Sequence, residues 1–263
     1  AWAGIVLVLS ALASLLPFLA GAPRAWSRLS ARDAVATALI GIVQFGLLIA
    51  LLNIGLVHVG AGLGALLFAT FPLMTMTIAT TAGHERFDAA LTAGVLLSIF
   101  GVALALGVRP PNLSGQQLAV GAACVLAAAL CGAVCSVLYR PLLQRHAMLP
   151  LGALAMAAAV LVLAPAAWAE GLGDRARLLS AAQWAVMAAV GLSSGVAYGV
   201  WLWVLKRTAP TKATAFLALS PVTATLIGSL ALGEPVGWGL LAGVVCILVG
   251  LALTARRQVS REG

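Results

Sequence analysis

Long apolar stretches separated by short links constrain this chain more than any other feature of its sequence. A helix that crosses about 30 Å of hydrocarbon needs about 20 mostly apolar residues. Nine stretches meet that length, at approximately residues 1–21, 35–57, 61–82, 89–108, 116–139, 149–169, 182–205, 210–232 and 237–255. They are rich in Ala, Leu and Gly and lack the two-residue alternation of membrane β-strands. The sequence therefore predicts an all-α polytopic membrane protein.

The composition excludes a water-soluble globule and points to membrane lipid as the surroundings of the chain. Of its 263 residues, 63% are hydrophobic and 8% charged, and the mean hydropathy is +1.11. The net charge of +8 comes from basic residues scattered between apolar runs, without the stripe of basic and aromatic residues that binds nucleic acid. We therefore expect no nucleic-acid partner.

The distribution of Lys and Arg predicts an orientation. Three of the fifteen fall in links on one side of the membrane, namely Arg109, Arg175 and Arg177, and the other twelve fall on the opposite side. Because basic residues concentrate in cytoplasmic loops, the richer side is assigned to the cytoplasm. This orientation predicts a multi-pass protein of a bacterial-type inner membrane with a cytoplasmic C-terminus.

The second half of the chain repeats the first at a constant offset of 149 residues. The offset gives four pairs of identical residues whose identity an apolar composition alone does not explain: Pro72 with Pro221, Glu85 with Glu234, Gly94 with Gly243 and Gly101 with Gly250. The repeats are predicted at 1–110 and 111–263. The stretch at 116–139 has no partner at this offset, which predicts that the first helix of a five-plus-five arrangement is missing from this chain. Because five is an odd number, the second repeat enters the membrane from the opposite side, and the two repeats are inverted relative to each other. Inverted repeats favour transport by alternating access.

The paired motifs resemble the EamA-type ten-helix exporters of the drug/metabolite transporter superfamily. They are Phe71-Pro72, Glu85 and Gly94/Gly101, and then Ser220-Pro221, Gly233-Glu234 and Gly243/Gly250. The resemblance covers nearly the whole chain and is closest to bacterial amino-acid exporters. It implies a basket-like bundle around a central cavity. The chain departs from the pattern where His84 stands in place of the second repeat's Gly233, and in the missing first helix.

Four polar or aromatic residues inside predicted spans are candidates to bind a substrate. Gln44 is a strongly polar side chain near the middle of its predicted span, where lipid offers its amide no partner. Ser194, Tyr198 and Trp201 form one stripe at i, i+4 and i+7 on a single helix. An aromatic belt at the membrane interface is the alternative for Trp201.

The paired prolines add candidate backbone groups. Pro72 and Pro221 lie near the middle of their predicted spans, and a proline in a helix leaves the carbonyl four residues earlier without a donor. The freed carbonyls belong to Phe68 and Leu217. Beside a cavity they can face water or substrate, whereas packing against neighbouring hydroxyls is the alternative.

All seven Asp and Glu residues lie in links or at the ends of spans. A proton-coupled exporter of lipophilic cations usually needs a carboxylate inside the membrane, so that mechanism is disfavoured. The predicted function is export of small zwitterionic or polar metabolites, with amino acids suggested by the resemblance, and without a metal or cofactor.

Two other functions remain open at this stage. One is a transporter of the same superfamily for a drug or a sugar conjugate. The other is an intramembrane enzyme, suggested only by Ser193 within a G-x-S-x-G match at Gly191–Gly195 that no strand precedes.

Overall fold

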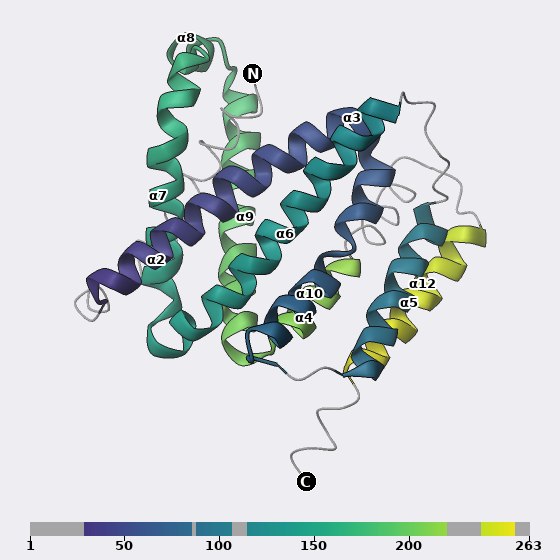
Figure 1. Cartoon of the computed structure of the whole chain (residues 1–263). Coiled ribbons are helices and arrows are strands. Elements are labelled where there is room, and N and C mark those ends of the chain that lie inside the picture. Colours follow the sequence, from purple (N-terminus) through teal and green to yellow (C-terminus); the bar gives the residue numbers. More distant parts are fainter. Residues whose placement is uncertain (1–28, 86–87, 107–114, 220–237, 256–263) are drawn as a thin grey trace. The chain divides into compact units, whose positions relative to one another are not determined.

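The computed structural model describes residues 29–85, 88–106, 115–219 and 238–255, and their regular structure is helical (Figure 1). The elements, in chain order, are α2 (Ala31–Gly41), the π-helix η2 (Ile42–Leu47), α3 (Leu48–Phe68), α4 (Phe71–Thr81), α5 (Ala89–Leu106), α6 (Gly115–Arg145), α7 (Met148–Ala169), α8 (Leu172–Arg177), α9 (Ala181–Arg207), α10 (Pro210–Ala215), the 3-10 helix η3 (Phe216–Ala218) and α12 (Trp238–Ala255).

The helices confirm the prediction of an all-α polytopic membrane protein. Within the described residues, five helical stretches are long and apolar enough to cross a membrane: Ala31–Val59, Leu63–Thr81, Gly115–Arg145, Met148–Ala169 and Ala181–Arg207. Shorter apolar helices cover Ala89–Leu104 and Leu241–Leu253. The stretch predicted at 1–21 lies outside the described residues.

Two boundaries differ from the sequence prediction. The link expected at 58–60 is helical, and α3 runs on to Phe68. The apolar run predicted as one helix at 61–82 is instead divided, because α3 ends before Thr70 and α4 begins at Phe71. Glycines alone do not end a helix, whereas Pro72 fits the first turn of a new one.

The chain forms two compact units, and each takes segments from both halves of the sequence. Unit 1 comprises Ala1–Ala50 and Leu138–Arg207, and unit 2 comprises Leu51–Val137 and Thr208–Gly263. The 149-residue offset relates residues 29–50 to 178–199, both in unit 1, and residues 59–106 to 208–255, both in unit 2. The compact units therefore follow a different division from the repeats predicted at 1–110 and 111–263.

In unit 2, α5 and α12 lie side by side in very close contact (Figure 1). A methyl group added at Gly101 would lie 2.7 Å from the Gly243 carbonyl oxygen, and one added at Gly250 would lie 2.5 Å from the Gly94 carbonyl oxygen. Small residues let helix backbones approach this closely, as is common in membranes. The paired glycines of the predicted repeats thus form the contact between these two helices.

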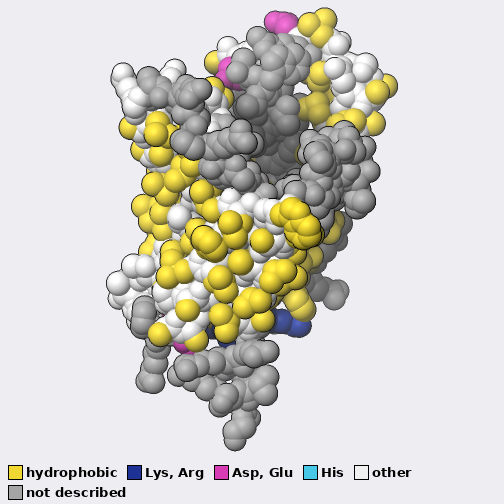
Figure 2. Space-filling view, turned by 90° about the vertical axis from the view of Figure 1, so that its right-hand side faces the viewer, with side chains coloured by type: hydrophobic (Ala, Val, Ile, Leu, Met, Phe, Trp, Pro, Cys, Tyr) yellow, Lys and Arg dark blue, Asp and Glu magenta, His cyan; other side chains and the backbone are white. Residues whose placement is uncertain are grey.

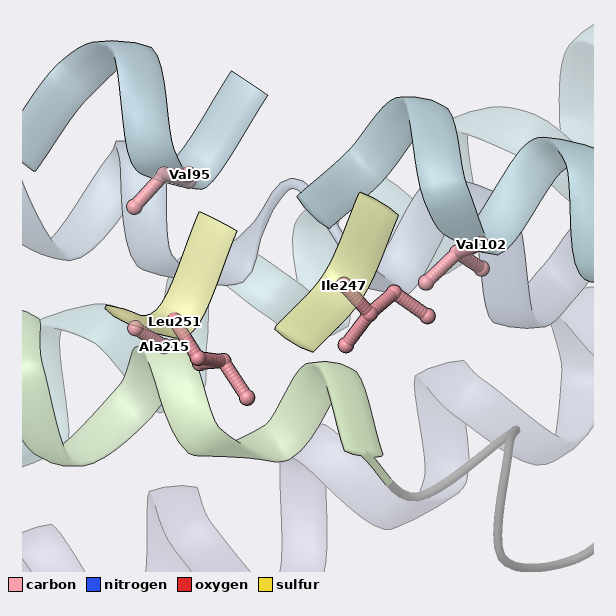
Figure 3. Close-up of a cluster of buried hydrophobic side chains, with 5 residues drawn as sticks. All are labelled: Val95, Val102, Ala215, Ile247 and Leu251. Carbon is pink, nitrogen blue, oxygen red and sulfur yellow. The ribbon is translucent and has the colours of Figure 1, made fainter. Parts of the chain in front are cut away.

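A buried apolar cluster continues this contact. It consists of Val95, Val102, Ala215, Ile247 and Leu251, contributed by α5, α10 and α12 (Figure 3). The outer faces of α5 and α12 are also apolar. Leu96, Phe100, Val245 and Leu248 are each about half exposed, and hydrophobic side chains cover most of the described surface in Figure 2. Such a surface is suited to lipid.

In unit 1, α2 crosses α7 where Gly41 meets the backbone of Ala155. Ala155 and Ala159 are fully buried. At the start of α2, the Ser30 hydroxyl accepts a hydrogen bond from the Asp33 N–H, which caps the helix. The Asp33 carboxylate also contacts His146, after the end of α6, at 2.7 Å. This contact joins two segments far apart in the sequence.

Candidate functional site

Both tyrosines of the chain meet inside unit 1. The Tyr198 hydroxyl, on α9, donates to the Tyr139 hydroxyl, on α6, at 2.9 Å. Tyr198 is 7% exposed and Tyr139 is 1% exposed. The Phe45 ring lies 4.7 Å from the Tyr198 ring, at an interplanar angle of 74°. Edge-on aromatic pairs of this kind add about 0.5–1.5 kcal/mol beyond the area they bury. Two hydroxyls and two rings are therefore held in a defined arrangement, which we call the tyrosine pair with Phe45.

Gln44, beside Phe45 in the chain, lies in the π-helix η2. The Leu48 N–H bonds the Val43 carbonyl, five residues earlier, as a π-turn requires. The side-chain oxygen of Gln44 is buried and accepts no hydrogen bond from the residues that the structure describes. An unsatisfied buried acceptor costs about 1–3 kcal/mol, so this oxygen is suited to a ligand that brings its own donor.

A glycine without close described neighbours lies two residues after Gln44. Gly46 is buried in the same π-turn, yet a methyl group there would meet nothing within 4 Å among the described residues. π-turns occur frequently at functional sites, because the widened turn displaces side chains from a regular helical face. The segment of residues 44–46 thus combines a polar acceptor, an aromatic ring and local free space.

Ser194 and Trp201 share α9 with Tyr198 but have different surroundings. Ser194 is exposed, although it precedes the buried Tyr198 by one turn, and Trp201 is half-buried. The neighbouring Ser193 hydroxyl donates to the Val190 carbonyl at 2.9 Å, an ordinary contact within a helix. Of the predicted stripe, only Tyr198 is brought into the aromatic contact with Phe45.

In unit 2, Pro72 stands in the first turn of α4. A proline is tolerated there because that turn's N–H groups have no acceptor within the helix. The sequence analysis placed Pro72 near the middle of one continuous span, and the structure interrupts the regular helix at Ala69 and Thr70. The Thr70 hydroxyl and N–H both donate to the Leu67 carbonyl, at 2.7 and 3.2 Å, which satisfies one acceptor at the end of α3.

The corresponding place in the second half is also irregular. Leu217 lies in η3, a single 3-10 turn that follows α10. The structure brings Phe68 and Leu217 together, since both side chains pack against the buried cluster of Phe71, Ala129 and Ala133. Pro221 lies outside the described residues. Both halves therefore depart from regular α-helix a few residues before the position of their proline.

Glu85, one of the paired acidic residues, caps a helix of the other half. Its carboxylate accepts the Thr211 N–H at 3.3 Å, in the first turn of α10. A negative charge stabilises the exposed N–H groups at a helix start. Before it, Gly83 adopts a positive φ of 72° just after α4, a conformation that glycine allows at helix ends. Its partner Glu234 lies outside the described residues.

Two residues important to this geometry are absent from the sequence prediction. Tyr139 falls at the end of a predicted span, and Phe45 has no polar group to mark it. A signal for Tyr139 did exist, because the chain has only two tyrosines and a buried phenol needs a hydrogen-bond partner.

Long apolar helices define a polytopic membrane protein, and helices interrupted near a proline, as before Pro72, are a feature of many secondary transporters. The sequence pattern described as "EamA-like transporter family" matches residues 2–107 and 119–256, and the chain belongs to that family.

Comparisons with individual proteins agree with this membership. The chain is 31% identical, over 99% of its length and 86% of the relative's, to a protein of Streptantibioticus cattleyicolor described as a "probable terminal-alkyne amino-acid exporter". It is 25% identical, over 84% of its length and 75% of the relative's, to the "uncharacterized transporter YoaV" of Bacillus subtilis. A solved structure with 20% identity covers 97% of this chain and 88% of its own, with a TM-score of 0.77, and supports the fold.

Proposed function

We propose that this transporter exports small zwitterionic or polar metabolites, with amino acids as the substrate class, by alternating access through a central cavity. The observation that carries the substrate class is the 31% identity, over 99% of the chain, to a protein described as an amino-acid exporter. The membrane is proposed to be a bacterial-type inner membrane. The cytoplasmic position of the C-terminus is proposed from the Lys and Arg distribution.

The chemistry of unit 1 supports this proposal. A zwitterion in hydrocarbon is prohibitively costly unless both of its charged groups find partners. The Gln44 side-chain oxygen is a buried acceptor suited to an ammonium group. The Tyr139 and Tyr198 hydroxyls can reorient to donate to a carboxylate, since a hydroxyl both donates and accepts. Phe45 supplies an apolar wall for a side chain.

The remaining candidates are proposed as substrate contacts within their own units. The breaks beside Phe68 and Leu217, and the prolines Pro72 and Pro221 that follow them, are proposed to expose backbone groups to the substrate. Ser194 and Trp201 are proposed to lie along its path. No acidic side chain occurs in the interior of the nine predicted spans. We therefore propose facilitated transport, without coupling to a proton gradient.

Flux measurements in proteoliposomes test the proposal. Purified protein would be reconstituted and assayed with a panel of labelled neutral, acidic and basic amino acids, with and without an imposed pH gradient. We expect saturable flux of neutral amino acids that the pH gradient does not accelerate. Flux of none of the amino acids, together with flux of a sugar conjugate or a lipophilic drug, would contradict the substrate class.

A further inference from the structure

Unit 1 contains a cavity of about 480 Å³ between the beginning of α2 and the end of α6. Nine residues line it, and all belong to that unit: Arg32, Asp33, Ala36, Leu39, Ile40, Leu138, Pro141, Leu142 and Arg145. The lining is apolar except for two arginines and one aspartate. The proposed transport function does not use this cavity.

The cavity changes character along its length. On α2, Arg32 precedes Leu39 by seven residues, and on α6, Leu138 precedes Arg145 by seven. Seven residues are two helical turns, so each pair shares a face and spans about 10 Å. The contact between Asp33 and His146 places both arginines at the same end of the cavity. One end is therefore basic and the deeper part is aliphatic.

The charge at the basic end is available to an anion. Arg32 and Arg145 are both exposed. The one acidic residue of the lining, Asp33, is held by His146 at 2.7 Å, and Lys206 donates to the His146 carbonyl at 3.1 Å. The lining thus carries two guanidinium groups and one carboxylate that already has a partner, which leaves net positive charge at this end.

The aliphatic part of the cavity is also exposed, and a small soluble anion would make no use of it. Leu39 is 58% exposed and Leu138 is 48% exposed, although both line the cavity. In a membrane protein, exposed leucines of this kind are suited to contact with hydrocarbon chains. A ligand that binds both the basic end and the aliphatic part needs an anionic head group joined to an aliphatic tail.

We propose that this cavity binds an anionic phospholipid, with the phosphate on Arg32 and Arg145 and an acyl chain along Leu39 and Leu138. Guanidinium groups bind phosphate oxygens through paired hydrogen bonds. Basic pockets between membrane helices recognise lipid headgroups by this chemistry. The lipid belongs to the leaflet on the Lys- and Arg-rich side of the membrane.

Native mass spectrometry of the purified full chain tests the proposal. Phosphatidylglycerol and phosphatidylcholine with identical acyl chains would be added in equal amounts, and the ratio of their bound forms measured. We expect a clear preference for phosphatidylglycerol, reduced by about fivefold for each arginine replaced. The test variant is Arg32→Gln with Arg145→Gln. The control, Arg207→Gln with Lys212→Gln, removes the same charge outside the cavity.

A second variant separates the cavity from the charge. Ala36→Phe fills the cavity and changes no charge, and it should also abolish the preference, provided that size-exclusion chromatography shows a folded protein. Equal preference in the wild type and the double-arginine variant would overturn the proposal. So would displacement of phosphatidylglycerol by an equal concentration of glycerol phosphate, which would indicate a site for soluble anions.

Discussion

In unit 2, Gly101 and Gly250 bring α5 and α12 so close that an added methyl group would strike the backbone of the facing helix. In unit 1, Gly46 is also buried, yet an added methyl group would meet nothing within 4 Å among the described residues. All three glycines belong to pairs related by the 149-residue offset. Identical residues in the repeat pattern therefore have opposite surroundings.

The polar contacts differ in the same way. The described contact of α5 with α12 is apolar and made by small residues. Unit 1 instead holds the tyrosine pair with Phe45 and the unsatisfied oxygen of Gln44. We therefore expect the close contact of α5 with α12 to contribute stability to unit 2, whereas the hydrogen-bonding groups of unit 1 are proposed to bind substrate. Substitutions in each unit can test that division.

Gly101→Ala should destabilise the protein most. The new methyl group would lie 2.7 Å from the Gly243 carbonyl oxygen and 2.8 Å from the Ile247 side chain. Backbone does not yield as a flexible side chain does, so a loss of about 3 kcal/mol is expected. A lower melting temperature in detergent, measured by circular dichroism, would show it.

Gly46→Ala is the matched control in unit 1. Because nothing described lies within 4 Å of the new methyl group, stability should stay unchanged or rise by at most about 1 kcal/mol from helix propensity. Equal destabilisation by Gly46→Ala and Gly101→Ala would remove the distinction between the units.

Tyr139→Phe and Tyr198→Phe should each have an intermediate effect. Either change removes the 2.9 Å hydrogen bond between the two hydroxyls, at a cost of about 0.5–1.5 kcal/mol. The double variant should be less destabilised than the sum of the single variants, because it removes both hydroxyls together. Strict additivity in a thermal double-mutant cycle would contradict a direct hydrogen bond.

Ser193→Ala should have the smallest effect. Its exposed hydroxyl donates to the Val190 carbonyl on the same helix, a contact that competes weakly with the hydrogen bonds of the helix backbone. Stability should change by less than about 0.5 kcal/mol, and transport should persist. Complete loss of transport from this single change would revive the hypothesis of a serine enzyme.

The sequence predicted the helices of this fold well, because membrane spans are defined by length and hydropathy alone. The ends of α7 and α9 agree with the predicted stretches to within two residues. The break before Pro72 was predicted in place but not in kind, since hydropathy does not distinguish a kinked helix from two helices.

Contacts between distant segments were beyond sequence reasoning. The partnership of Tyr139 with Tyr198 joins residues 59 positions apart, and that of Asp33 with His146 joins residues 113 apart. Separations this long lie far beyond the three or four residues that join neighbours on one helix, so no local sequence pattern predicts these contacts. The π-turn that holds Gln44 was also missed, because its energy depends on tertiary packing. The roles of Gln44, Ser194, Tyr198 and Trp201 in binding stay predictions.

Gln44→Leu tests the central claim most directly, because it replaces an amide by an apolar side chain of similar size. If the buried oxygen serves a substrate, its removal relieves an unsatisfied acceptor, so stability should hold or increase while transport falls. Initial rates of labelled neutral amino-acid flux, measured in liposomes with monodisperse wild type and variant, decide the matter. We predict at least a tenfold loss of flux at an unchanged or higher melting temperature, corresponding to about 1.4 kcal/mol of lost interaction. Wild-type flux from Gln44→Leu would contradict the assignment of unit 1 as the substrate-binding region.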